Sequence, residues 1–134
     1  MKNLSESEWA LLKVLWERER ATAREVTEAL SATRGWAYST VKTMLERLVE
    51  KGAVSGRKVG RAWEFSPAIT PEQARRSAWR KFVDKAFGGA LDPALRFLAT
   101  ETELTASQRE ALRALLDDIE APDASPPDAG AGDA

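Results

Sequence analysis

The sequence has 134 residues, a hydrophobic fraction of 43% and a formal net charge of −1, which fits one or two small soluble domains. It contains neither cysteine nor histidine. This excludes disulfides, thiolate metal sites and the Ser–His–Asp and Cys–His arrangements of enzymes, so we expect no metal and no cofactor. It has no run of about 18 apolar residues and no signal-peptide core at its N-terminus, so we expect a cytoplasmic protein without membrane insertion.

Charge is distributed unevenly along the chain. Residues 1–70 hold 12 basic and 9 acidic side chains, a net charge of +3, whereas residues 71–120 carry −1 and residues 121–134 carry −3. A basic excess in the N-terminal half is what contact with a nucleic acid requires, although an excess of this size proves little by itself.

Two short helices are predicted before residue 31. Ser5 to Glu8 has the pattern of a capping box and predicts a helix to about Glu19. Thr22 to Glu25 repeats the pattern and predicts a second helix, followed by turn-forming residues at 31–36. Core packing is the expected role of the apolar residues of the first helix, which are Trp9, Leu11, Leu12, Leu15 and Trp16.

A third helix with two different faces is predicted from Tyr38 to Lys51, and Gly52 is suited to end it in a left-handed conformation. With the two helices before it, it makes a helix-turn-helix pattern. The apolar stripe consists of Val41, Leu45, Leu48 and Val49. The candidate DNA-reading residues are Ser39, Thr40, Lys42 and Thr43 for the major groove and Arg47 nearer the phosphates. The alternative is a solvated helix whose Ser and Thr residues cap its start.

A β-hairpin is predicted for residues 53–66, because Trp63 and Phe65 alternate with Ala62 and Glu64. Its tip carries three cations, Arg57, Lys58 and Arg61. Such cations can protect an edge strand, but after a polar helix they favour contact with a phosphate backbone or the minor groove. Helix-turn-helix and hairpin together predict a winged helix.

Three amphipathic helices are predicted between residues 71 and 120. They start at the Thr70–Gln73 capping pattern, at Asp92-Pro93 and at Thr105–Gln108. About 50 residues make a poor independent core, so a second copy of the segment should complete it. The predicted dimerisation residues are Trp79, Phe82, Phe87, Leu91, Leu95, Leu98, Leu112, Leu115 and Leu116. Residues 121–134 contain only Ala, Asp, Pro, Gly and Ser and should be disordered.

Four motifs in the chain resemble the BlaI/MecI penicillinase-repressor family: Ser5–Trp9, Leu15-Trp16, Thr40–Gly52 and Gly60–Phe65. The resemblance covers about residues 4–120. It implies a dimeric winged-helix repressor of a palindromic operator, often upstream of β-lactam-resistance genes, and induction through cleavage by a membrane-bound sensor metalloprotease. In the best-known members the cleaved bond lies between Asn and Phe, whereas this chain has Arg96 before Phe97. The absence of cysteine disfavours the copper-responsive branch of the family.

The expected fold is therefore mainly α with a small β-hairpin wing. A winged helix-turn-helix at residues 1–68 is followed by a helical dimerisation domain at 69–120 and an acidic tail at 121–134. The expected partners are a double-stranded DNA operator, a second copy of the chain and a membrane sensor metalloprotease. The alternative is a winged helix that binds proteins and not DNA, while an enzyme has no catalytic constellation to build on.

Overall fold

The computed structural model describes residues 3–120, with side chains described as far as residue 118. The predicted tail at 121–134 lies outside the described residues. The chain divides into two compact units at Gly89 and Ala90. The fourth helix therefore belongs to the first unit by its contacts, and the division by function at residue 68 stays a prediction.

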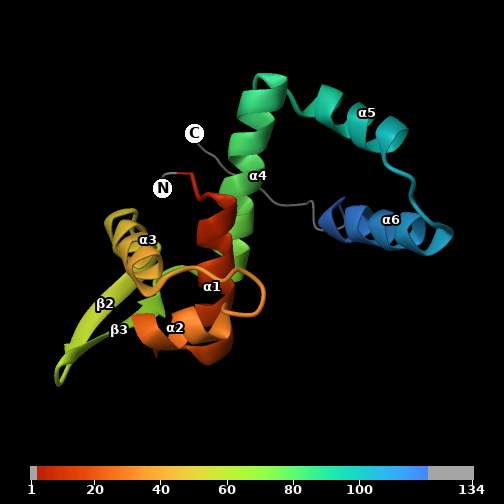
Figure 1. The fold of residues 1–134 in the computed structure, drawn as a ribbon. Helices are drawn as coiled ribbons and strands as arrows, with labels where there is room; N and C mark the ends of the chain where they lie inside the picture. The colour runs from red at the N-terminus through yellow and green to blue at the C-terminus, as the bar shows by residue number, and fades with distance from the viewer. Residues whose placement is uncertain (1–2, 121–134) are drawn as a thin grey trace. The chain divides into compact units, whose positions relative to one another are not determined.

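The first three helices follow the sequence prediction closely (Figure 1). They are α1 (Glu6–Arg18), α2 (Ala23–Ala29) and α3 (Tyr38–Glu50). Both predicted capping boxes are present at the starts of α1 and α2, each satisfying two backbone N–H groups that the helix leaves without an internal partner. Gly52 follows α3 with a φ of 82°, the left-handed conformation expected of it.

The hairpin consists of β2 (Val54–Val59) and β3 (Ala62–Pro67), which pair antiparallel. A short strand that the sequence did not predict, β1 (Ala21–Thr22), pairs with β3, so the sheet has the order β1-β3-β2. Arg57 and Lys58 lie within β2 and not at the tip, where residues 60 and 61 make the turn. The prediction of these two cations at the tip was wrong because the ladder extends to the last pair before the turn.

The core of the first unit is formed by apolar side chains from all of these elements. The largest fully buried side chains are Leu11, Leu12, Leu15, Val26, Val41, Leu45 and Leu48. Val49 was predicted to join the apolar stripe of α3 but is 38% exposed. Its position one residue after Leu48 turns it about 100° away from the buried face.

Lys51 and Trp16 make three long-range hydrogen bonds that tie α1, and the residues just before it, to later parts of the chain. Lys51, at the end of α3, donates to the Glu8 carboxylate at 2.6 Å and to the backbone carbonyl of Asn3 at 2.8 Å. The indole Nε1 of Trp16 donates to the carbonyl of Ile69 at 3.0 Å. These bonds join α1 and the residues before it to the end of α3 and to the segment before α4, and none of them could be read from local sequence.

Helix α4 (Pro71–Phe87) begins with the predicted capping box at Thr70 and ends at Gly88 in a left-handed conformation. Ala74 and Val83 are buried, and one groove of the first unit is lined by residues of α4 and of the start of α1. The Phe82 ring lies between two other rings of the same helix, 6.0 Å from Trp79 and 5.7 Å from Phe87 between centroids.

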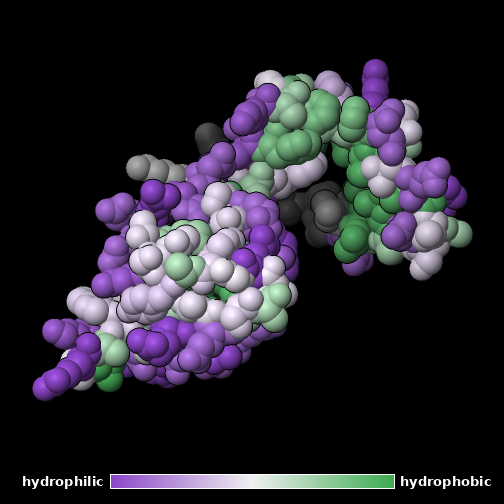
Figure 2. All heavy atoms as spheres, viewed as in Figure 1, coloured by the Kyte–Doolittle hydropathy of each residue, from purple (hydrophilic) through white to green (hydrophobic). Residues whose placement is uncertain are grey.

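The second unit contains α5 (Leu91–Glu101) and α6 (Ala106–Glu120). The predicted cap of α6 is present, with reciprocal hydrogen bonds between Thr105 and Gln108. Within residues 90–118 only Ala94 is buried. Figure 2 shows hydrophobic residues on the surface of α5, of α6 and of the C-terminal end of α4. The apolar faces of these helices are formed as predicted, but the described chain does not cover them.

Replacing Lys51 with Met should lower the free energy of unfolding by about 3 kcal/mol, because it leaves the buried Glu8 carboxylate without its cation. Burial raises the pKa of Glu8, but hydrogen bonds from Lys51 and Ser5 outweigh it and hold the pKa below its ordinary value of 4.5. Stability from this pair is therefore fully present above pH 4.5 and is lost as pH falls through the lowered pKa.

Urea unfolding followed by circular dichroism at pH 7 and at several values below 4.5 measures both effects. Arg76→Met is the control, since Arg76 and Glu72 form an exposed pair whose loss should cost less than about 0.5 kcal/mol. Equal losses for the two variants would show that the Glu8–Lys51 pair contributes no more than a surface ion pair.

Candidate nucleic-acid interface

The outward face of α3 carries all five predicted DNA-reading side chains. Ser39, Thr40, Lys42, Thr43 and Arg47 are exposed. Val41, Leu45 and Leu48 on the opposite face are fully buried, and this packing determines which residues the helix presents. The structure therefore brings the five polar residues together on one surface.

The start of α3 differs from the starts of α1, α2 and α4. Its N-cap is Ala37, which supplies no side-chain hydrogen bond, and the first turn contains no acidic residue. The Ser and Thr residues at this end do not cap the helix, so their hydroxyl groups are available for other partners. A helix start without acidic side chains keeps its partial positive charge, which favours approach of a phosphate.

The hairpin separates its three predicted cations. Lys58 is the cross-strand partner of Trp63, so both side chains project from the same face of the sheet. Arg57 is the cross-strand partner of Glu64 and projects from the other face, where its guanidinium lies 3.6 Å from the Glu64 carboxylate. Arg61 lies in the turn. The wing is therefore not a uniform cationic surface.

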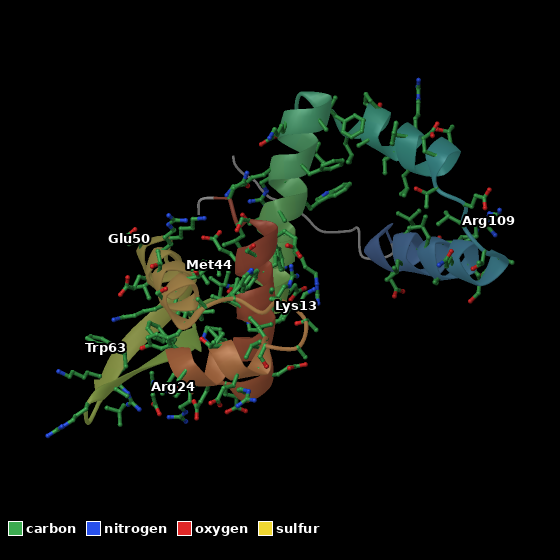
Figure 3. The ribbon with its side chains drawn as sticks, in the orientation of Figure 1. Lys13, Arg24, Met44, Glu50, Trp63 and Arg109 are labelled. Carbon is green, nitrogen blue, oxygen red and sulfur yellow. The ribbon has the colours of Figure 1, made fainter. Side chains whose placement is uncertain are left out.

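One groove runs between α3, the start of α2 and the hairpin. Figure 3 shows Trp63 on the hairpin near α3 and Arg24 on α2. The guanidinium carbon of Arg24 lies 5.5 Å from the ring centroid of Tyr38, a cation–π contact that joins the starts of α2 and α3. The residues that line the groove are Thr22, Ala23, Arg24, Tyr38, Lys42, Glu46, Val49, Gly56, Arg61, Ala62, Trp63 and Phe65.

Sequence reasoning assigned no role in this groove to Arg24, Tyr38 or Trp63. Trp63 was expected to point the same way as Phe65, and it does, but Phe65 is buried whereas Trp63 is 51% exposed. A large aromatic residue at the exposed end of an alternating strand is the feature that could have identified it. The contact between Arg24 and Tyr38 joins residues 14 positions apart and had no local signature.

Four of the cations predicted to bind DNA have no acidic partner among the residues that the structure describes. Lys42, Arg47, Lys58 and Arg61 form no ion pair there, in contrast to Arg57. Several unpaired cations on one surface attract an anionic polymer such as DNA. Within residues 3–118, no group of three or more acidic side chains is placed to hold a metal ion. None of the described helices has the length and apolar composition needed to cross a membrane.

The predicted dimerisation residues lie on α4, α5 and α6 and are exposed except for Phe87, which is half-buried. Leu115 has the most exposed side chain of the set, at 59%. Arg96 and Phe97, at the predicted cleavage position, lie within α5 and are exposed. The predicted dimerisation residues form the apolar faces that a partner of the C-terminal helices would cover.

Comparison with known proteins identifies relatives over most of the chain. Residues 4–118 match the family described as penicillinase repressor. The penicillinase repressor of Bacillus licheniformis is 31% identical over 99 residues, which are 73% of this chain and 77% of that protein. The methicillin resistance regulatory protein MecI of Mammaliicoccus sciuri is 21% identical over 84% of this chain and 92% of its own. The solved DNA-binding domain of the repressor BlaI is 36% identical. The match covers 53% of this chain and 90% of that domain, with a TM-score of 0.48.

Single substitutions on the wing should separate its two faces. Lys58→Ala and Arg61→Ala should each reduce the slope of log affinity for DNA against log salt concentration by about one unit, the effect of one lost phosphate contact. Arg57→Ala should reduce it by less, because Arg57 already pairs with Glu64 on the other face. Fluorescence anisotropy with labelled duplex DNA at several salt concentrations measures the slopes. Equal reductions for all three variants would contradict the division of the wing into two faces.

Proposed function

The chain belongs to the penicillinase repressor family, and we propose that it represses transcription as a homodimer on a palindromic DNA operator. Members of this family are DNA-binding regulators and not enzymes. The observation that carries the proposal is the outward face of α3, where hydroxyl groups, Lys42 and Arg47 stand together opposite a fully buried stripe. Groups of this size and chemistry can reach base edges in a major groove.

The wing and α3 have different roles in binding DNA. Hydroxyl and ammonium groups of α3 select the base sequence, while Lys58 and Arg61 hold the backbone and set the register of the protein on the duplex. A protein-binding module is the competing function. The exposed rings of Tyr38 and Trp63 would suit it, but the unpaired cations on the same surface favour an anionic polymer such as DNA. Binding to DNA in a gel shift separates the two functions directly.

The exposed apolar faces of α4, α5 and α6 support the homodimer. A helix with one apolar face is stable when that face is buried against another element, and α6 has no buried side chain among residues 106–118. A second copy supplies an apolar face of the same composition. Two heads would then bind two half-sites about one helical turn apart, and the operator would be palindromic.

Relief of repression by proteolysis fits the same arrangement. The names of the relatives connect them with penicillinase and methicillin resistance, and the corresponding inducing signal would be a β-lactam sensed by a membrane metalloprotease. Cleavage at Arg96-Phe97, in the cytoplasm, would divide α5 and remove its apolar face from the dimer. Bound to the promoter, the intact dimer blocks RNA polymerase.

Lys42→Ala and Thr43→Ala test the reading of bases by α3. Each should weaken binding to the operator by about 1–3 kcal/mol and leave binding to a scrambled duplex nearly unchanged, because a base contact distinguishes sequences. The operator is first selected from a random-sequence pool, and affinities are compared at one salt concentration. Equal losses on both duplexes would mean that these side chains touch only phosphates.

Leu95→Asp combined with Leu98→Asp tests the dimer. Two charges on the exposed apolar face of α5 should abolish dimerisation, because burying them without partners is strongly unfavourable. Thr100→Asp is the matched control, since Thr100 is exposed and lies on another side of the same helix. Size-exclusion chromatography with light scattering gives the mass of each variant. A double variant that stays dimeric and binds a full palindrome normally would place the dimer contact elsewhere.

A further inference from the structure

We propose that the groove between α3, the start of α2 and the hairpin binds one strand of the DNA, and that Arg24 and Trp63 contact this strand. This inference rests on the proposed function and adds residues to it. Arg24 would bind a phosphate of that strand, and the Trp63 indole would lie against the neighbouring deoxyribose. Neither residue belongs to the surface predicted from the sequence.

The geometry of duplex DNA requires one strand to pass between α3 and the hairpin when both of them contact the DNA. The major and minor grooves of B-DNA are separated by a single sugar–phosphate strand. A helix in the major groove and a hairpin in the adjacent minor groove therefore stand on either side of it. In this protein the space between helix and hairpin is a groove whose lining includes the cations Arg24, Lys42 and Arg61, one carboxylate, Glu46, and the Trp63 ring. The strand has no other route between the two elements.

Arg24 has the right chemistry and position for a phosphate in this groove. It has no carboxylate partner among the described residues, and its guanidinium is held over the Tyr38 ring. That contact restrains a long side chain before DNA arrives, so less conformational entropy is lost on binding. The guanidinium can still donate to a phosphate, because a ring face occupies none of its N–H groups.

Trp63 fits the sugar better than it fits a structural role. Its neighbour on the strand face, Phe65, supplies the core contact and is buried, whereas Trp63 is exposed. Both rings lie over the backbone of Gly56, where a Cβ would come within 3.6 Å of Trp63 and 3.4 Å of Phe65. The indole is thus supported from below by Gly56 and open to the groove. An exposed flat ring between cations suits a deoxyribose, whose surface is apolar and lies between two phosphates.

The test uses the full chain and a selected operator in which single phosphates are replaced by neutral methylphosphonates. For the wild-type protein, one or two replacements on the strand between the two grooves should weaken binding about tenfold, as expected for loss of a charge-assisted hydrogen bond. In Arg24→Gln the same replacements should have little further effect, and the salt slope should fall by about one unit.

Arg20→Gln is the matched control for charge, because Arg20 lines a groove that contains Arg57 and Glu64 from the other face of the hairpin. Its methylphosphonate pattern and salt slope should equal those of the wild type. Trp63→Leu should weaken operator binding about tenfold, and Trp63→Phe should recover most of the loss. Val59→Ala, an exposed apolar residue of the same hairpin, should bind normally.

The outcomes separate this inference from the proposed function. If Lys42→Ala weakens operator binding but Arg24→Gln keeps the wild-type methylphosphonate pattern, the strand does not lie in this groove and the inference is wrong. If the wild type binds no duplex specifically, the proposed function itself fails. Because each methylphosphonate effect is a ratio measured within one variant, a variant that folds incompletely still gives a decisive pattern.

Discussion

The packing of Val41, Leu45 and Leu48 into the core fixes the rotation of α3 about its axis, and every proposed contact of α3 with DNA depends on that rotation. All three side chains are fully buried, so a turn of the helix would expose apolar surface and bury polar groups at a cost of several kcal/mol. The Lys51–Glu8 pair holds the C-terminal end of the same helix against α1. Apolar contacts thus determine which side of α3 faces outward, and one ion pair holds its C-terminal end.

Short-range patterns in the sequence were sufficient to predict the helices and the hairpin. Capping boxes such as Thr70–Gln73 act over three residues, and a buried stripe such as that of α3 repeats every three or four, so both are visible in the sequence itself. The family match confirmed the predicted membership of the BlaI/MecI penicillinase-repressor family. The assignment of individual side chains to bases, phosphates and the dimer stays a prediction.

What the sequence could not reveal depends on contacts between distant residues. Strand register decided that Lys58 shares a face with Trp63 and that Arg57 pairs with Glu64, and register is set by the whole hairpin and its turn. The contact of Arg24 with the Tyr38 ring similarly requires α2 and α3 to be packed together. Electrostatic partners that cross between elements were therefore missed, although each residue was visible as a charge or an aromatic ring.

The core of the winged helix and the proposed dimer surface use different parts of the chain, so the proposed cleavage in α5 would affect only the dimer. The core cluster of the winged helix runs from Leu11 to Phe65, with Ile69 packed against it, so loss of α5 leaves its apolar contacts intact. The second DNA contact of a dimer is effectively intramolecular and strengthens binding by about two to four orders of magnitude. Cutting α5 would remove this gain without unfolding either head. In the proposed switch, a single cleavage would therefore release the operator although each head keeps its full reading surface, because occupancy would depend on the coupling of two modest contacts.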